Sequence, residues 1–245
     1  MVNNIVLSAR NLCKEFSGNG TMAPALNKCN LELRKGELLF ICGPNGSGKT
    51  TLLRVLAGMI EYQGKIEYHA NDGQKFDWNS VRDGLCVWVP QEVGDAIAYS
   101  VRIDEIISIS HRHELSNLAK HLGLDWIFTG GKGKLSKQLV GNLSGGQRQL
   151  LVGLLAISGN RSVLLLDEVF RSLDDQIRDK YLEMVRTAVK QSNGSALIVS
   201  HDLDFTVKNA DRILAMRRGS ITREFIPTEL DQGELISQLA SELWR

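Results

Sequence analysis

Residues 43–50 constrain the fold of this chain more than any other segment. They read G-P-N-G-S-G-K-T, which fits the pattern G-x-x-x-x-G-K-[ST] of a loop that cradles phosphate groups. A short apolar run at residues 38–42 predicts a buried strand before the loop, and residues 51–58 have apolar positions at helical spacing. Such a loop binds phosphate because its backbone N–H groups and the following helix N-terminus face the anion. A chance glycine-rich turn is the alternative, and the matching flanks argue against it.

The residue types in this loop predict a site for a nucleoside triphosphate and Mg²⁺. Glycines let the backbone approach phosphate oxygens, Lys49 has the length to reach the β- and γ-phosphates, and the Thr50 hydroxyl is a magnesium ligand. We count Lys49 among the catalytic residues as well. The residues expected to bind the nucleotide here are Gly43, Pro44, Asn45, Gly46, Ser47, Gly48, Lys49, Thr50 and Thr51.

The composition is that of an ordinary globular protein. Of the 245 residues, 43% are hydrophobic and 23% are charged. Lys and Arg total 29 against 28 acidic residues, and this net charge of +1 argues against nucleic acid or an anionic membrane as a partner. No apolar run is long enough to span a bilayer, and the first residues do not resemble a secretion signal. Four scattered cysteines without a C-x-x-C pair are expected to be reduced packing residues of a cytosolic protein.

The order of predicted elements indicates an α/β fold with a mostly parallel sheet covered on both faces. Strand patterns lie at residues 5–7, 25–33, 64–68, 85–89, 162–167, 196–200 and 212–216, and helical patterns at 103–109, 115–122 and 147–157. The first strands predict an N-terminal antiparallel β portion. We expect one domain over residues 1–245, with a core at about 1–100 and 142–225, a helical insertion subdomain at about 101–141 and a C-terminal helical tail at about 226–245.

Two acids follow the apolar strand at residues 162–166. An acid at the carboxyl end of a buried strand beside a phosphate loop holds magnesium, directly or through water, and we assign this role to Asp167. Glu168 is then placed to polarise the water that attacks the γ-phosphate. The alternative is a strand that simply ends in two solvated acids.

A third motif, L-S-G-G-Q at residues 143–147, precedes an apolar helical run. With it, the chain resembles the ATP-binding cassette family from about residue 5 to 225, because further family motifs occur in the expected order. Gln91 matches the glutamine loop, S-L-D at 172–174 matches the D-loop with Asp174, His201 matches the switch histidine, and Phe16 lies where the family has an adenine-stacking aromatic.

The resemblance implies an ATPase that works as a head-to-tail dimer with itself or a related cassette. In the family, the signature motif closes over ATP held by the other subunit, which here implies roles for Ser144, Gly145, Gly146, Gln147 and Asp174. It also implies that His201 contacts the γ-phosphate, and that Gln91 contacts magnesium or water and links the site to a partner. A core histidine, a surface amide and an ordinary buried Phe16 are the alternatives.

Some residues depart from the family pattern or stay outside it. Val169 replaces a common proline, Phe170 and Arg171 are unusual there, and basic residues are absent at Leu150 and Leu155. These positions bear on rate and partner choice and not on the type of reaction. His111 to His113 and the lysines at 132, 134 and 137 are interpreted as solvated segments, since no acids or cysteines accompany the histidines.

The resemblance implies an ATP-hydrolysing subunit that powers transport of a substrate through separate transmembrane permease subunits. Because the chain itself lacks a membrane span, we expect a peripheral location on the cytoplasmic face of the inner membrane. The alternative is a soluble ATPase of the same family that drives assembly of a protein complex, as in iron–sulfur scaffold machinery. The complete S-G-G-Q of the signature argues against this alternative.

Overall fold

A computed structural model describes residues 4–18, 21–70, 72–91, 98–109, 119–120, 138–159, 161–171 and 173–244. Its strands are β1 (Ile5–Gly18), β2 (Thr21–Arg34), β3 (Leu38–Cys42), β4 (Gln63–His69), β5 (Lys75–Asp77), β6 (Cys86–Val89), β7 (Val163–Asp167), β8 (Ser195–Val199), β9 (Arg212–Arg217) and β10 (Ser220–Phe225). Its α-helices are α1 (Lys49–Leu56), α2 (Trp78–Leu85), α3 (Ile103–Ile109), α6 (Gly145–Ile157), α7 (Asp175–Gln191), α8 (Leu203–Asn209) and α9 (Gln232–Leu243), with short 3-10 turns η3 (Val140–Asn142) and η4 (Pro227–Glu229).

The central sheet is mostly parallel, as the sequence predicts. Among the described residues it has six strands in the order β10-β9-β3-β8-β7-β6. The strands from β9 to β6 pair in parallel, and β10 joins the edge as an antiparallel partner of β9. Every residue of β3, β7 and β8 is buried, which explains why these segments are continuously apolar instead of alternating.

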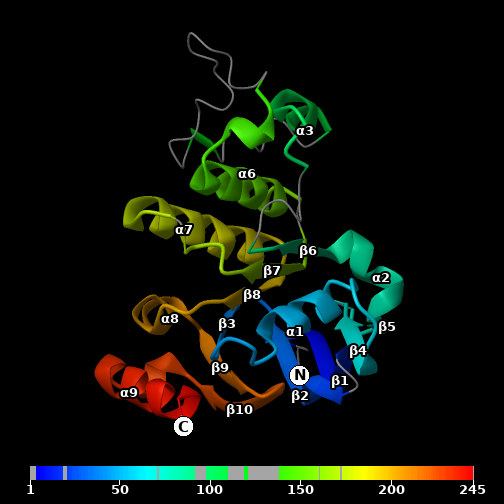
Figure 1. Cartoon of the computed structure of the whole chain (residues 1–245), viewed down its shortest axis with the longest axis vertical. Helices are drawn as coiled ribbons and strands as arrows, with labels where there is room; N and C mark the ends of the chain where they lie inside the picture. The colour runs from blue at the N-terminus through cyan, green and yellow to red at the C-terminus, as the bar shows by residue number, and fades with distance from the viewer. Residues whose placement is uncertain are drawn as a thin grey trace.

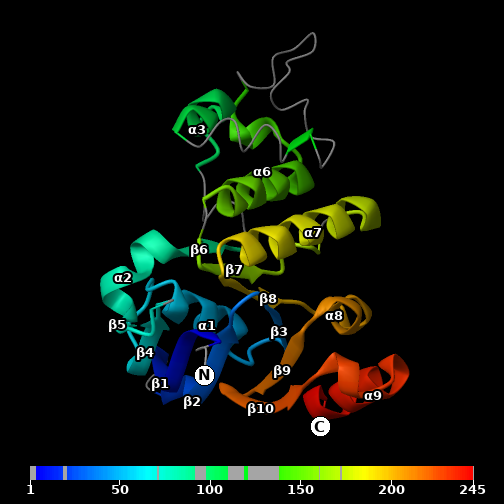
Figure 2. The same ribbon diagram turned by 180° about the vertical axis from the view of Figure 1, so that it is seen from behind.

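Two hydrophobic cores lie on opposite faces of this sheet. Because successive strand residues point to opposite faces, Leu38 and Phe40 of β3 belong to one core, and Leu39 and Ile41 belong to the other. The first core contains buried residues of α6, α7, α8 and α9, and the second contains those of α1, β1, β2 and β4. The ribbon shows the same layers in both views (Figures 1 and 2).

The expected N-terminal antiparallel portion is present as a second sheet. In the described part of the chain it has four strands in the order β2-β1-β4-β5, and its pairs are antiparallel. β1 and β2 are much longer than the apolar runs that predict them, because their pairing continues past those runs as far as Gly18 and Thr21. Helix α2 follows β5 and begins at an N-cap, Asp77, whose carboxylate accepts a hydrogen bond from the Asn79 amide at 3.0 Å.

The region of the expected helical insertion is described only at its edges. Helix α3 lies where residues 103–109 predict it, while most of the predicted helix at 115–122, His111 to His113 and the lysines at 132, 134 and 137 lie outside the described residues. The domain limits proposed from the sequence therefore stay predictions. Within the described segments, no helix combines the length and the apolar character that crossing a bilayer requires.

Candidate functional site

The predicted motifs meet at one edge of the central sheet. The phosphate loop follows β3 and Gln91 follows β6. Asp167 is the last residue of β7, Glu168 follows it, and His201 follows β8. Because β3, β8, β7 and β6 are neighbours and parallel, their carboxyl ends lie side by side. Ligands of open parallel sheets bind at this edge.

The glycines of the phosphate loop are required by close packing and backbone conformation. Gly46 and Gly48 have φ angles of 78° and 106°, which favour glycine. A side chain at Gly48 would lie 2.4 Å from the Ala25 carbonyl oxygen, and one at Gly43 would lie 2.3 Å from the Met216 carbonyl oxygen. The loop is thus wedged between β2 and β9, which fixes its backbone.

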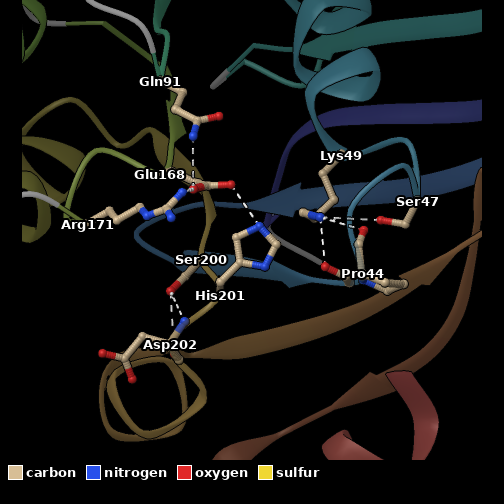
Figure 3. A network of polar contacts seen from close by, with 10 residues as sticks. Pro44, Ser47, Lys49, Gln91, Glu168, Arg171, Ser200, His201 and Asp202 are labelled. Carbon is tan, nitrogen blue, oxygen red and sulfur yellow. Dashed lines mark hydrogen bonds and ion pairs between the residues drawn. The ribbon is translucent and has the colours of Figure 1, made fainter. Parts of the chain in front are cut away.

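Lys49 folds back onto its own loop. Its ammonium donates hydrogen bonds to the carbonyl oxygens of Gly43 and Pro44, at 2.7 and 3.0 Å (Figure 3). The residue is only 6% exposed, and burial lowers the pKa of its ammonium, a shift that nearby Glu168 and Asp167 oppose. A buried cation held by neutral carbonyls is suited to exchange them for an anionic phosphate.

Asp167 carries a buried carboxylate that has no ion-pair partner among the described residues. Neither of its oxygens completes a hydrogen bond with a described residue, and the residue is 1% exposed. Burial raises the pKa of its carboxyl, and the facing Thr50 hydroxyl opposes that rise. An unpaired carboxylate beside a hydroxyl is a donor set that suits Mg²⁺, so the residues fit the expected ion.

Glu168 is the centre of a polar network. Its Oε1 lies 2.8 Å from Nε2 of His201, and its Oε2 accepts hydrogen bonds from Nε2 of Gln91 at 3.3 Å and Nη1 of Arg171 at 3.2 Å. Figure 3 shows these side chains converging on the carboxylate from three segments. Gln91 thus contacts Glu168 and not Asp167 in this structure. The sequence reasoning missed the contact of Arg171, although its spacing of three residues from Glu168 was a signal.

A cavity of about 390 Å³ lies beside this network. Asn45 of the phosphate loop lines it together with Glu168 and His201. The loop and the two candidate catalytic side chains therefore face one shared space. This is the arrangement in which a terminal phosphate at the loop is within reach of a base and a hydrogen-bond donor.

The signature residues lie away from the loop of the same chain. Ser144 caps α6: its hydroxyl accepts from the Gln147 amide at 3.2 Å, and its own N–H donates to the Gln147 side chain at 2.9 Å. A side chain added at Gly145 would meet nothing within 4 Å, so this helix start is open. Both ribbon views place α6 toward the end of the molecule opposite α9, beyond α7 (Figures 1 and 2). Asp174 likewise caps a helix, α7, by accepting from the Ile177 amide at 3.1 Å.

Phe16 is exposed and lies on the hairpin that borders the loop. It is 47% exposed, and the Lys14 ammonium lies 5.3 Å from its ring centroid. Its backbone partner is Ala23 on β2, two residues before Ala25, which packs against Gly48. An exposed aromatic this close to the phosphate loop agrees with a stacking role better than with a core role.

Comparisons with known proteins give the chain a family. A family model described as "ABC transporter" matches residues 26–171. The sulfate/thiosulfate import ATP-binding protein CysA 2 of Chromobacterium violaceum is 32% identical over 232 residues, which are 91% of this chain and 59% of that protein. The Fe(3+) ions import ATP-binding protein FbpC of Haemophilus influenzae is 31% identical over 249 residues, 94% of this chain and 65% of that protein. The chain thus spans less than two thirds of the length of both relatives.

A solved structure has the same fold. It is a dimeric structure of a post-hydrolysis state of an ATP-binding cassette bound to ADP and Pi, with a TM-score of 0.74 and 20% sequence identity. The alignment covers 90% of this chain and 98% of that one. The α/β class with a phosphate loop after a central parallel strand is therefore confirmed by both structure and comparison.

Proposed function

Since this chain belongs to the ATP-binding cassette family, we propose that it binds and hydrolyses ATP and thereby powers transport through separate transmembrane subunits. The observation that carries the proposal is the buried, unpaired carboxylate of Asp167 beside Thr50 and Lys49. Burying such a charge is costly unless a cation binds there. A Mg²⁺–nucleotide complex supplies the missing cation.

Each residue of the site has a task in this reaction. The phosphate loop, residues 43–50, binds the phosphates with its backbone N–H groups. The Lys49 ammonium leaves the carbonyl oxygens of the loop and binds the β- and γ-phosphates. Thr50 and Asp167 would hold Mg²⁺, and the ion would offset phosphate charge. Glu168 accepts a proton from the attacking water, because its carboxylate lines the cavity that Asn45 of the phosphate loop also lines. His201 is positioned to donate a hydrogen bond to the γ-phosphate.

Further residues complete the proposed site. Gln91 contacts Glu168 at 3.3 Å and, once released, is placed to contact magnesium or water. Phe16 stacks on adenine, and Thr51 extends the phosphate-binding helix start. Ser144, Gly145, Gly146, Gln147 and Asp174 act on the nucleotide of a second cassette, because α6 lies far from the loop of its own chain.

The relatives support a role in uptake at a membrane. Both are named as import proteins, one for sulfate or thiosulfate and the other for Fe(3+). We propose import as the direction, permease subunits as partners and the cytoplasmic face of the inner membrane as the location. The comparisons do not favour the alternative of a soluble assembly ATPase.

The first prediction tests hydrolysis with the purified chain. Lys49→Ala removes the buried cation, so ATP binding is expected to weaken by about tenfold or more, with turnover lost. Glu168→Gln keeps the shape of the side chain and removes the base, so ATP binding is expected to persist while turnover falls by about a hundredfold. Fluorescent-nucleotide titration and phosphate release measure the two quantities. Wild-type turnover in either variant would contradict the roles assigned here.

A further inference from the structure

Arg171 is a permanent cation that contacts Glu168, and the assigned machinery leaves it without a role. Its guanidinium Nη1 lies 3.2 Å from Oε2 of the carboxylate. We propose that Arg171 is a positioning residue that holds the Glu168 carboxylate in place throughout turnover. This inference rests on the proposed function and adds to it a residue outside the motifs of the sequence analysis.

The backbone places Arg171 for this contact. Glu168 adopts a left-handed φ of 50°, which turns the chain sharply at the end of β7. The Arg171 amide then donates a hydrogen bond to the Glu168 carbonyl oxygen at 3.1 Å, which closes a tight turn. Both side chains consequently leave the turn on the same side, and the ion pair forms within one turn of the chain.

Two buried residues inside the turn fix it to the core. Val169 is fully buried and Phe170 is 5% exposed. The Phe170 ring centroid lies 5.3 Å from that of Tyr181 and 5.3 Å from that of Phe205. The turn therefore cannot shift without disturbing α7 and α8, and the starting point of the Arg171 side chain is fixed.

The other two partners of Glu168 come from elsewhere and have other tasks. His201 follows β8 and Gln91 follows β6, and the proposed function engages both with the nucleotide or its magnesium. When a triphosphate occupies the loop, His201 and Gln91 leave the Glu168 carboxylate and contact the nucleotide or its magnesium instead. Arg171 shares the turn with Glu168 and remains, so it becomes the partner that preserves the orientation of the base.

Charge makes such a partner necessary. Asp167 adds a second carboxylate directly beside Glu168, and the two repel. A triphosphate adds further negative charge, so without a cationic partner the Glu168 carboxylate would be pushed away from both. The Arg171 side chain is 70% exposed, so its contribution is expected in catalysis and not in folding.

The test compares Arg171→Met, Arg171→Gln and Arg171→Lys in ATP turnover by the purified chain. Met and Gln keep much of the side-chain length and lose the charge, so kcat is expected to fall about tenfold while KM changes less than about twofold. Lys restores a cation, and its kcat is expected to recover to within about threefold of wild type. Arg223→Met is the matched control, because Arg223 contacts Phe225 and Gln238 outside the site. It is expected to leave both constants unchanged.

The outcomes separate this inference from the function on which it rests. If the wild-type chain hydrolyses ATP, Glu168→Gln stops it and both uncharged Arg171 variants keep wild-type kcat, the positioning role is wrong and the function stands. An equal loss in the Lys variant, or a rise in KM that accounts for the loss, also overturns it. If the wild-type chain does not hydrolyse ATP, or Glu168→Gln has no effect, the proposed function itself fails.

Discussion

At the scale of single residues, the buried Asp167 carboxylate lowers the stability of the folded chain. Burial raises the folded-state pKa of this group above its unfolded value. The ionised form is therefore disfavoured by folding, and stability is lost as the pH rises above the unfolded pKa. That loss is relieved as the pH falls through the raised folded-state pKa. In the proposed function, the same carboxylate binds magnesium, which gives this destabilising group a purpose.

We predict that Asp167→Asn stabilises the nucleotide-free chain and abolishes its response to Mg²⁺–ATP. Removing a buried, unpaired charge is expected to raise the free energy of unfolding by about 1 kcal/mol or more near neutral pH. The gain over wild type should shrink as the pH is lowered, because wild-type Asp167 then becomes protonated. Thermal unfolding across a pH series, with and without Mg²⁺–ATP, measures both effects. The exposed Asp179→Asn on α7 is the control and should change neither; a destabilised Asp167→Asn chain would contradict the account.

At the scale of elements, the packing of α6 on α7 depends on one glycine and one tyrosine. A side chain at Gly153 would overlap the Tyr181 hydroxyl, so a glycine at this position leaves the space that the ring occupies. The Tyr181 hydroxyl itself is fully buried and has no hydrogen-bond partner among the described residues. Burial raises the pKa of this phenol, so the hydroxyl stays neutral. A buried O–H group without an acceptor destabilises the folded chain.

Tyr181→Phe is therefore predicted to stabilise the chain. The substitution keeps the edge contact with Phe170 and removes a buried polar group that has no partner, which is worth about 1 kcal/mol. Urea unfolding followed by tryptophan fluorescence gives the change in midpoint. The ATPase rate of the variant should equal that of the wild type, because the ring keeps its contact with Phe170 and only the hydroxyl, which bonds to no described site residue, is removed. A lower midpoint would show that the hydroxyl has a partner, such as a buried water.

The same elements show what a sequence can predict. β3, β7 and β8 were predicted because buried parallel strands read as unbroken apolar runs. Helix α7 was missed because it is largely polar and buries one stripe only, formed by Tyr181, Leu182, Met184, Val185 and Val189. Motif order also predicted which side chains gather at the sheet edge. The contacts around Glu168 were beyond prediction, since they depend on rotamers contributed from three segments.

At the scale of the whole molecule, the two halves of the proposed site are far apart in one chain. The phosphate loop lies at the carboxyl edge of β3, whereas Ser144 begins α6 near the opposite end of the molecule from α9 (Figure 1). Each half is well formed, since the loop is wedged between strands and Ser144 is held by its capping box. In the proposed head-to-tail dimer, a second copy would bring the open start of its α6 to the nucleotide.

The last prediction concerns this dimer. In the Glu168→Gln background, ATP is expected to convert the chain from monomer to dimer, because the bound γ-phosphate bridges the loop of one copy and the α6 start of the other. Adding Ser144→Asp should prevent this, since Asp is a good N-cap that preserves α6 but places a negative charge against the phosphate. Light scattering with size-exclusion chromatography measures the mass with ATP and with ADP.

Ser144→Ala separates the cap from the charge. It is expected to cost about 1 kcal/mol of stability through loss of the N-cap and to weaken the ATP-dependent dimer without abolishing it. The Asp variant should keep the thermal stability of the parent and still remain monomeric. If the Asp variant dimerises with ATP as its parent does, the phosphate held by one copy does not meet the α6 start of the other, and the head-to-tail arrangement is wrong.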